Sequence, residues 1–130
     1  MRRDVTTLEV VREWLKIPAT AGTVPVETLT LAYRAAEARV HERTQSLWSA
    51  PVTRDPLTGR LVRVWDPDVE PPEDLVLAVC LLTARHLVRR LTPEGLASMG
   101  DGIVGRVPGS DADALALMDP WRPISVGGGA

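Results

Sequence analysis

The sequence has little of what catalytic centres and disulfide frameworks are built from: its 130 residues include one cysteine, two histidines, one tyrosine and no phenylalanine. Cys80 lies within an apolar run, so it cannot form an internal disulfide and is expected to pack as a small apolar residue in a reducing compartment. His41 and His86 are far apart in the sequence, and no serine or cysteine stands in a recognisable nucleophile setting. We therefore expect that the protein is not an enzyme.

Two short motifs associated with cofactors are incomplete or out of context. The segment HERTQ at 41–45 begins like a zinc-protease helix but has Gln45 where the second histidine ligand must stand, so no metal site is expected. The segment GDGIVG at 100–105 matches the dinucleotide fingerprint G-x-G-x-x-G, which works only between a strand and a helix. Here a weak helical turn precedes it and RVPG follows, which predicts a loop and no cofactor.

Long apolar stretches and an excess of one charge are also absent. The longest apolar run, 75–82, falls far short of the ~20 residues that a membrane-spanning helix needs, and no signal-peptide stretch follows the N-terminal arginines. We therefore expect a chain that is cytosolic when made. The formal net charge is -2 with acidic and basic residues interleaved, which disfavours tight, nonspecific binding to nucleic acid.

Apolar residues recur at helical spacing in the first half of the chain. Thr6 and Glu9 have the spacing of a capping box and predict a short amphipathic helix over 7–16. A second helix is predicted over 25–46, with Thr23 as its possible cap. The predicted apolar faces comprise Leu8, Val11, Trp14 and Leu15 in the first helix and Val26, Leu29, Tyr33, Ala36 and Val40 in the second. The predicted solvated positions of the second helix include Glu27, Arg34, Glu37, Arg39, Glu42 and Arg43.

A third helix is predicted over 72–91, and it is apolar almost all round from Leu75 to Ala84. We expect it to be central in the fold, with Leu77 and Leu81 in the core. Its C-terminal end carries Arg85, Arg89 and Arg90. These arginines are interpreted as compensating the helix dipole and pairing with acidic neighbours, and contact with nucleic acid or an acidic partner is the alternative.

The segment 48–65 predicts a β-hairpin, because the turn sequence from Asp55 to Gly59 separates two short stretches rich in β-branched residues. Pro51 favours an edge position for the first strand. The second stretch does not alternate cleanly, so the sequence leaves the buried face of the hairpin open.

A last helix is predicted over 111–118, with Ser110 and Asp113 at capping-box spacing and Pro120 as its stop. The chain has four tryptophans, most of which are expected in the core. Because tryptophan is enriched at protein interfaces, the exposed ones are expected to be Trp48 and Trp65 at the hairpin borders or Trp121 in the tail.

Four segments together resemble a known family: TTLEVVREWLKIP, LTLAYRAAEARVHERT, PEDLVLAVCLLTARHLVRR and DADALALMDPWRPISVG. In this order they resemble the head-to-tail connector (adaptor) proteins of long-tailed bacteriophages. The closing segment of that family has a short helix, a Pro-aromatic-Arg step and a small apolar end. Here the step is Pro120-Trp121-Arg122, with Trp where Tyr is more usual.

The residues and the resemblance together imply a mainly α fold, namely a small helical bundle of about four helices with a short β-hairpin insertion and an extended C-terminal segment. Residues 1–126 are expected to form one connector-like domain, in which 111–126 is a docking segment, and 127–130 a disordered tail. The resemblance implies a structural virion protein at the head-to-tail junction, assembled in the cytoplasm of the bacterial host. It would form a ring of about a dozen copies between portal and tail and extend the DNA channel.

The partners implied are further copies of the chain, the phage portal protein and a tail-side connector or stopper protein; packaged DNA would pass through the lumen without sequence-specific binding, and no membrane is involved. The residues expected to bind the portal are Leu115, Met118, Pro120, Trp121, Arg122 and Ile124. Those expected to contact a neighbouring copy or the tail side are Trp48, Arg54, Arg60 and Trp65. Two alternatives stay open: a cytosolic helical adaptor or regulator unrelated to virions, and a Trp121 that only covers the domain's own core.

Overall fold

The computed structural model describes residues 3–16, 24–90 and 111–123 of the chain. The described α-helices are α1 (Leu8–Leu15), α2 (Val26–Thr44), α3 (Glu73–Arg90) and α6 (Ala112–Met118). They are joined by two short strands, β1 (Val52–Arg54) and β2 (Leu61–Arg63), and two 3-10 turns, η1 (Leu47–Ser49) and η2 (Asp119–Trp121). The prediction of a small, mainly α-helical bundle with a short β-hairpin is confirmed. In the described ranges, no helix combines the length and the apolarity that crossing a membrane would require.

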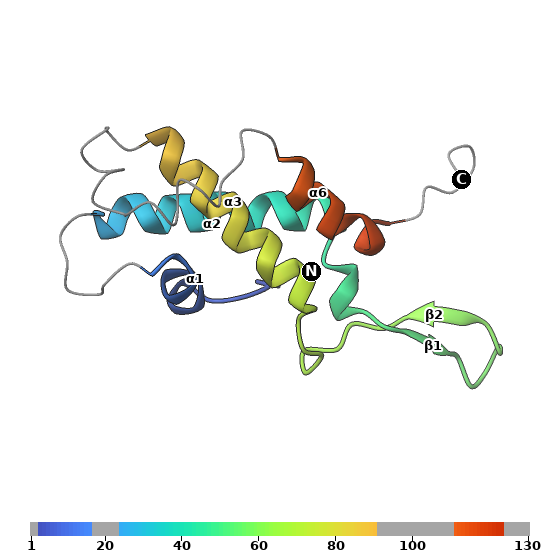
Figure 1. Ribbon diagram of the computed structural model, residues 1–130. Coiled ribbons are helices and arrows are strands. Elements are labelled where there is room, and N and C mark those ends of the chain that lie inside the picture. The colour runs from blue at the N-terminus through green and yellow to red at the C-terminus, as the bar shows by residue number, and fades with distance from the viewer. Residues whose placement is uncertain (1–2, 17–23, 91–110, 124–130) are drawn as a thin grey trace.

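Helix α3 lies at the centre of the bundle, as its apolar sequence predicted. It contacts α1, α2 and α6, and it crosses α2 in a roughly opposite chain direction (Figure 1). Leu75, Val79 and Leu87 are fully buried in the core that these helices share. Leu81 is also buried, but Leu77 is 37% exposed, so its predicted place in the core is wrong. Leu77 lies on the side of α3 that its neighbours leave uncovered.

Helix α2 has its apolar face where the periodicity predicted, with two exceptions. Leu29 and Val40 are buried, but Val26 is 58% exposed because it is the first residue of the helix and extends beyond the core. Glu37, predicted on the solvated side, is only 3% exposed. Pro25 stands at the N-cap position without a side-chain cap, and the expected cap Thr23 lies outside the described residues.

Helix α1 begins one residue later than the capping-box prediction. Thr7, not Thr6, is the N-cap, and its hydroxyl accepts a hydrogen bond from the Val10 amide at 3.3 Å. The backbone of Thr6 is engaged elsewhere, because its carbonyl accepts a 2.6 Å hydrogen bond from the Tyr33 hydroxyl. Lys16 ends the helix in the left-handed conformation, with φ of 59°.

The hairpin arm, residues 51–65, extends away from the helical body (Figure 1). Its antiparallel strands pair Val52 with Arg63 and Arg54 with Leu61. Gly59 has φ of +71°, which glycine adopts without strain, and its amide donates to the Asp55 carbonyl at 2.8 Å to close the turn. Every residue of both strands is exposed. Both faces of the hairpin are therefore open to solvent, so neither is the buried face that the sequence left undecided.

Helix α6 packs on α3 and belongs to the body rather than to a free tail. Ala114 and Met118 are fully buried, and Trp121 of the following turn packs against the core. The first residues of α6 are tied to α3 by an ion pair between Arg85 and Asp113. The predicted cap Ser110, the loop 91–109 with its GDGIVG motif, and the segment 124–130 lie outside the described residues.

Candidate functional site

Two surfaces of the described residues, the hairpin arm and a cluster of arginines, are candidates for binding. Within them, no group of three or more His, Cys, Asp or Glu side chains is arranged to hold a metal ion. Cys80 is buried, and burial, followed by the negative charge of Glu37, raises the pKa of its thiol to about 11. A thiol that stays protonated at neutral pH is a poor nucleophile, so Cys80 serves packing.

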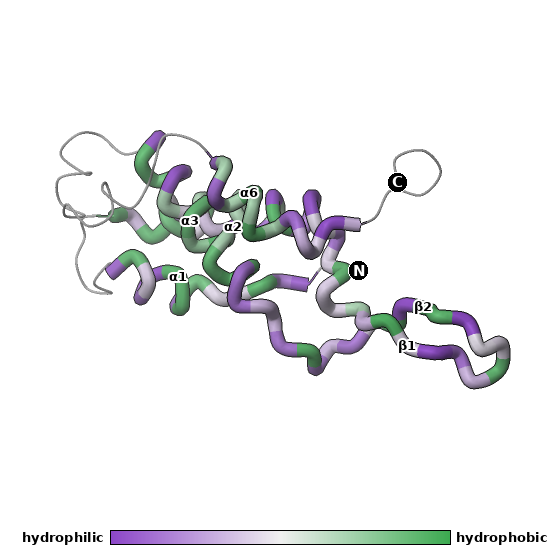
Figure 2. Tube along the Cα trace, turned by 45° about the vertical axis from the view of Figure 1, so that its right-hand side comes forward, coloured by the Kyte–Doolittle hydropathy of each residue, from purple (hydrophilic) through white to green (hydrophobic). Residues whose placement is uncertain are grey.

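The hairpin arm concentrates exposed apolar area, and Figure 2 shows its apolar residues on a ribbon that leaves the body. Six large apolar side chains are more than a third exposed: Val52, Leu57, Leu61, Val62, Val64 and Trp65. Leu57, at the tip, is 92% exposed. Apolar residues gathered on one exposed element mark a site of protein contact more often than scattered ones do.

The arm is held by contacts within the chain, so its surface is preorganised. Asp55 organises the tip, because its carboxylate accepts hydrogen bonds from the Leu57 amide at 2.9 Å and the Thr58 hydroxyl at 3.0 Å. These bonds also lower the pKa of Asp55. Arg54 donates to the Gly59 carbonyl at 2.7 Å, and Arg63 reaches back to the Ala50 carbonyl at 3.0 Å. An isolated two-stranded hairpin is only marginally stable, and these bonds supply local support.

The base of the arm is clamped by the N-terminal segment. The Arg3 guanidinium lies 4.8 Å from the centre of the Trp48 ring and donates to the Val69 carbonyl at 2.6 Å. Trp48 is only 5% exposed, because η1 directs its ring into the body. The expectation that Trp48 forms an interface is therefore corrected to a core role, whereas Trp65 is 42% exposed. Arg54 and Arg60 are exposed as an interface role requires.

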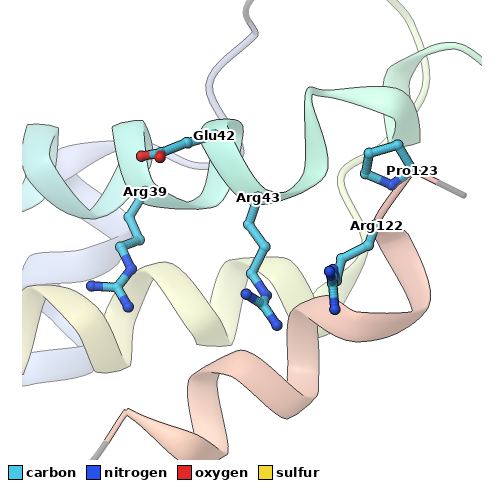
Figure 3. A pocket seen from close by; sticks show the side chains of 5 residues that line it. All are labelled: Arg39, Glu42, Arg43, Arg122 and Pro123. Atoms are coloured by element: carbon cyan, nitrogen blue, oxygen red, sulfur yellow. The ribbon is translucent and has the colours of Figure 1, made fainter. Parts of the chain in front are cut away.

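A second surface, the arginine pocket, lies where the C-terminal segment passes over α2. Its cavity of about 510 Å³ is lined by Arg39, Glu42, Arg43, Arg122 and Pro123. The three arginine side chains extend toward the same space, whereas Glu42 points away from them (Figure 3). From the sequence, Arg39 and Arg43 were expected only to be solvated positions of the second helix. Residues at i, i+4 spacing lie on the same face of a helix, so the sequence could have placed these two arginines side by side. The position of Arg122 beside them depends on the tertiary structure.

The basic end of α3 is largely neutralised inside the protein. Arg85 is 2% exposed and is paired with Asp113, and its guanidinium also lies 3.4 Å from Asp111. Asp111 further attracts Arg89, at 3.5 Å, and Arg39, at 3.6 Å. Burial alone would raise the pKa of Asp113, but hydrogen bonds from Arg85 and the Ala114 amide lower it. This arrangement favours the interpretation that Arg85 and Arg89 pair with acidic neighbours, whereas the side chain of Arg90 lies outside the described residues.

Glu37 is a buried carboxylate that the sequence pattern did not reveal. It accepts hydrogen bonds from the Val5 amide at 2.9 Å and the Tyr33 hydroxyl at 3.0 Å, and so fastens the N-terminal segment to α2. Burial raises its pKa above the ordinary value, although these hydrogen bonds oppose the shift. Tyr33, four residues earlier on the same helix face, was the available sequence signal.

The residues expected to bind the portal differ in accessibility. Met118 is fully buried, so its side chain cannot contact a partner in this conformation, and that expectation is corrected. Leu115 and Trp121 are partly buried against the core, whereas Pro120 and Arg122 are exposed. Ile124 lies outside the described residues.

Comparisons of the chain with known protein families, with curated proteins and with solved structures give no match.

Proposed function

We propose that this protein is a structural subunit of an oligomeric ring that lies between the portal and the tail of a long-tailed phage. Two things support the proposal: the sequence resemblance to connector proteins, and a fold in which a small helical body carries an exposed apolar arm. The exposure of the arm is the main structural support for this proposal. The arm's apolar side chains have no cover within the described chain, whereas the body has a closed core.

An arm of this kind suits head-to-tail assembly of identical copies. The arm and the surface that receives it would be different parts of the chain, and such heterologous contacts close into a ring when the rotation between copies allows it. Leu57, Leu61 and Trp65 would supply apolar contact area, and Arg60 would supply charged contacts at the rim. A ring of about a dozen copies would continue the DNA channel beneath the portal.

The C-terminal segment would provide the contact with the portal. After η2, Arg122 adopts an extended conformation, with φ of -74° and ψ of 146°, and Pro123 follows. The helical part of the segment therefore ends at Trp121, and Arg122 and Pro123 continue beside α2, where they line the arginine pocket. Because Met118 and Trp121 pack in the body, the docking function is assigned mainly to the chain from Arg122 onward.

The proposal is tested by mixing the purified protein with portal rings and following complex formation by sedimentation velocity and electron microscopy. We expect rings of the protein on one face of the portal. A chain ending after Pro123 should keep its thermal stability but lose portal binding, whereas a chain ending after Met118 should also melt at a lower temperature because it lacks Trp121. A protein that stays monomeric and ignores portal rings would instead fit the non-virion adaptor or regulator.

A further inference from the structure

We propose that the arginine pocket binds the acidic segment, residues 66–74, of a second copy of this chain. The inference rests on the proposed function in one respect, namely that copies associate with one another. It adds the identity of the two surfaces that meet and the chemistry of their contact, which is guanidinium with carboxylate.

The pocket offers positive charge that its own surroundings satisfy only in part. Arg39 and Arg122 are 44% and 53% exposed, and their nearest carboxylates lie 3.6 Å and 3.8 Å away, at Asp111 and Asp119. Arg43 alone among the three donates a hydrogen bond to a carboxylate, that of Asp119 at 3.0 Å. Each guanidinium has five N–H donors in a planar fork that matches a carboxylate. The Nε of Arg43 is buried, so the donors that a ligand can reach are mainly those of Arg39 and Arg122.

The acidic segment, DPDVEPPED, offers the complementary charge. It has five carboxylates in nine residues and no basic residue. No salt bridge joins any of these carboxylates to a described residue. Pro67 and Asp68 lie in a turn, and Glu73 and Asp74 form the first turn of α3, so the segment is already folded and loses little conformational freedom on binding.

Contacts at the backbone hold the segment to its own body and leave several of its carboxylates exposed. The Asp66 carboxylate is used within the segment, because it accepts a hydrogen bond from the Asp68 amide at 2.9 Å, and Val69 packs against the core. The Asp66 amide donates to the Ser49 carbonyl at 2.7 Å, and the Val69 carbonyl accepts from Arg3 at 2.6 Å. Asp68, Glu70 and Asp74 are exposed. A rigidly presented row of carboxylates is suited to contact with another molecule.

A second copy of the chain could supply a partner for the arginine pocket and another for the acidic segment. Each copy carries one pocket and one acidic segment, so the same contact can repeat from copy to copy in one direction around a ring. The arm is a weaker candidate receptor for the segment, because Arg54 and Arg63 already donate to backbone carbonyls of their own chain. Arg39 and Arg122 form only long ion pairs with Asp111 and Asp119, at 3.6 Å and 3.8 Å, and are 44% and 53% exposed.

Binding of a fluorescently labelled peptide of residues 64–76 to the full-length protein tests the contact directly. We expect saturable binding that weakens as salt is raised from 50 to about 300 mM, because the contact is between exposed charges. Arg39→Glu and Arg122→Glu should each weaken binding roughly tenfold, since a like charge then faces the ligand. The control is Arg34→Glu, the same charge change at an exposed position of α2 that does not line this pocket.

The proposal is overturned if the peptide fails to bind at millimolar concentration, or if Arg34→Glu weakens binding as much as the pocket variants do. It is also overturned if single-stranded DNA or inorganic phosphate displaces the peptide at lower concentration than unlabelled peptide does, since the pocket then prefers phosphate. Assembly on portal rings separates this inference from the proposed function. Rings that still form with Arg39→Glu, a pocket residue to which no portal contact is assigned, would reject the pocket contact and leave the ring proposal intact.

Discussion

The helical body and the hairpin arm use the same apolar residue types in opposite ways. In the body, Leu75, Val79 and Leu82 are shielded from water by three neighbouring helices. In the arm, Leu61 and Val64 stand on a two-stranded ribbon and remain more than half exposed. Burial of apolar area stabilises the body, whereas the arm is held mainly by hydrogen bonds and leaves its apolar side chains exposed to solvent. The body therefore buries its own apolar residues, whereas the arm leaves apolar area that, on the proposed function, a neighbouring copy would cover.

The sharpest test of the body compares two leucines of α3. Leu81→Asp should abolish cooperative unfolding, because an unpaired carboxylate at this buried position costs several kcal/mol against a total stability of roughly 5–15 kcal/mol. Leu77→Asp should leave a cooperative transition, because that side chain is 37% exposed. Thermal unfolding followed by circular dichroism measures both. Equal melting of the two variants would show that α3 does not have the covered and uncovered sides described above.

Leu77 and Leu81 also show which features of this fold the sequence pattern could predict and which it could not. Periodicity identified α2, α3 and α6, and the Asp55–Gly59 signal identified the hairpin, because these features are encoded by local spacing and turn chemistry. Periodicity could not say which side of the nearly all-apolar α3 faces solvent, since every side of it looks suitable for burial. That choice depends on where α1, α2 and α6 pack.

The candidate site was less predictable, because it depends on contacts between distant segments. Trp48 was expected at an interface from its place beside the hairpin, but its burial depends on η1 and on Arg3, which is 45 residues earlier in the sequence. The arginine pocket brings together residues of α2 and of the C-terminal segment. Glu37 has a charged side chain, so its burial was not expected from the sequence. Its burial is explained by hydrogen bonds to Val5 and Tyr33, which become apparent in the folded structure.

The next largest effect is expected where α6 is tied to the body. Arg85→Ala should lower the free energy of unfolding by about 3 kcal/mol, because it removes the buried guanidinium that faces Asp111 and Asp113. Arg89→Ala, which removes a 55% exposed partner of Asp111, is the matched control and should have an effect below about 1 kcal/mol. Urea unfolding measures both values. If the two variants lose similar amounts of unfolding free energy, the burial of Arg85 does not make its ion pairs more stabilising than those of the exposed Arg89.

Glu37 should make the stability of the body depend on pH. Burial raises its folded-state pKa above the ordinary value of 4.5, so the folded chain binds this proton more tightly than the unfolded chain does. The resulting contribution is fully present below pH 4.5 and is lost as pH rises through the folded-state pKa. Glu37→Gln has no charge to bury, so its stability relative to the parent should increase as pH rises through this window.

Urea unfolding of both proteins between pH 4 and pH 8 measures that difference. Glu37→Ala is the companion variant, and it should lose roughly 1–3 kcal/mol because the buried Val5 amide is left without its acceptor. A difference between Glu37→Gln and the parent that does not change with pH would contradict a raised pKa at Glu37.

The smallest effect on folding, and the one most informative about assembly, is expected in the arm. Leu61→Thr combined with Val64→Thr should change the free energy of unfolding by no more than about 0.5 kcal/mol, because both side chains are exposed and threonine suits a strand. The same pair should abolish self-association and ring formation on portals, since it removes apolar area that only a partner can bury. Leu31→Gln, at a 54% exposed position of α2, is the control for apolar loss outside the arm and should assemble normally. Loss of stability without loss of assembly would reverse the assignment, because the arm would then belong to the folded body and the contact between copies would lie elsewhere.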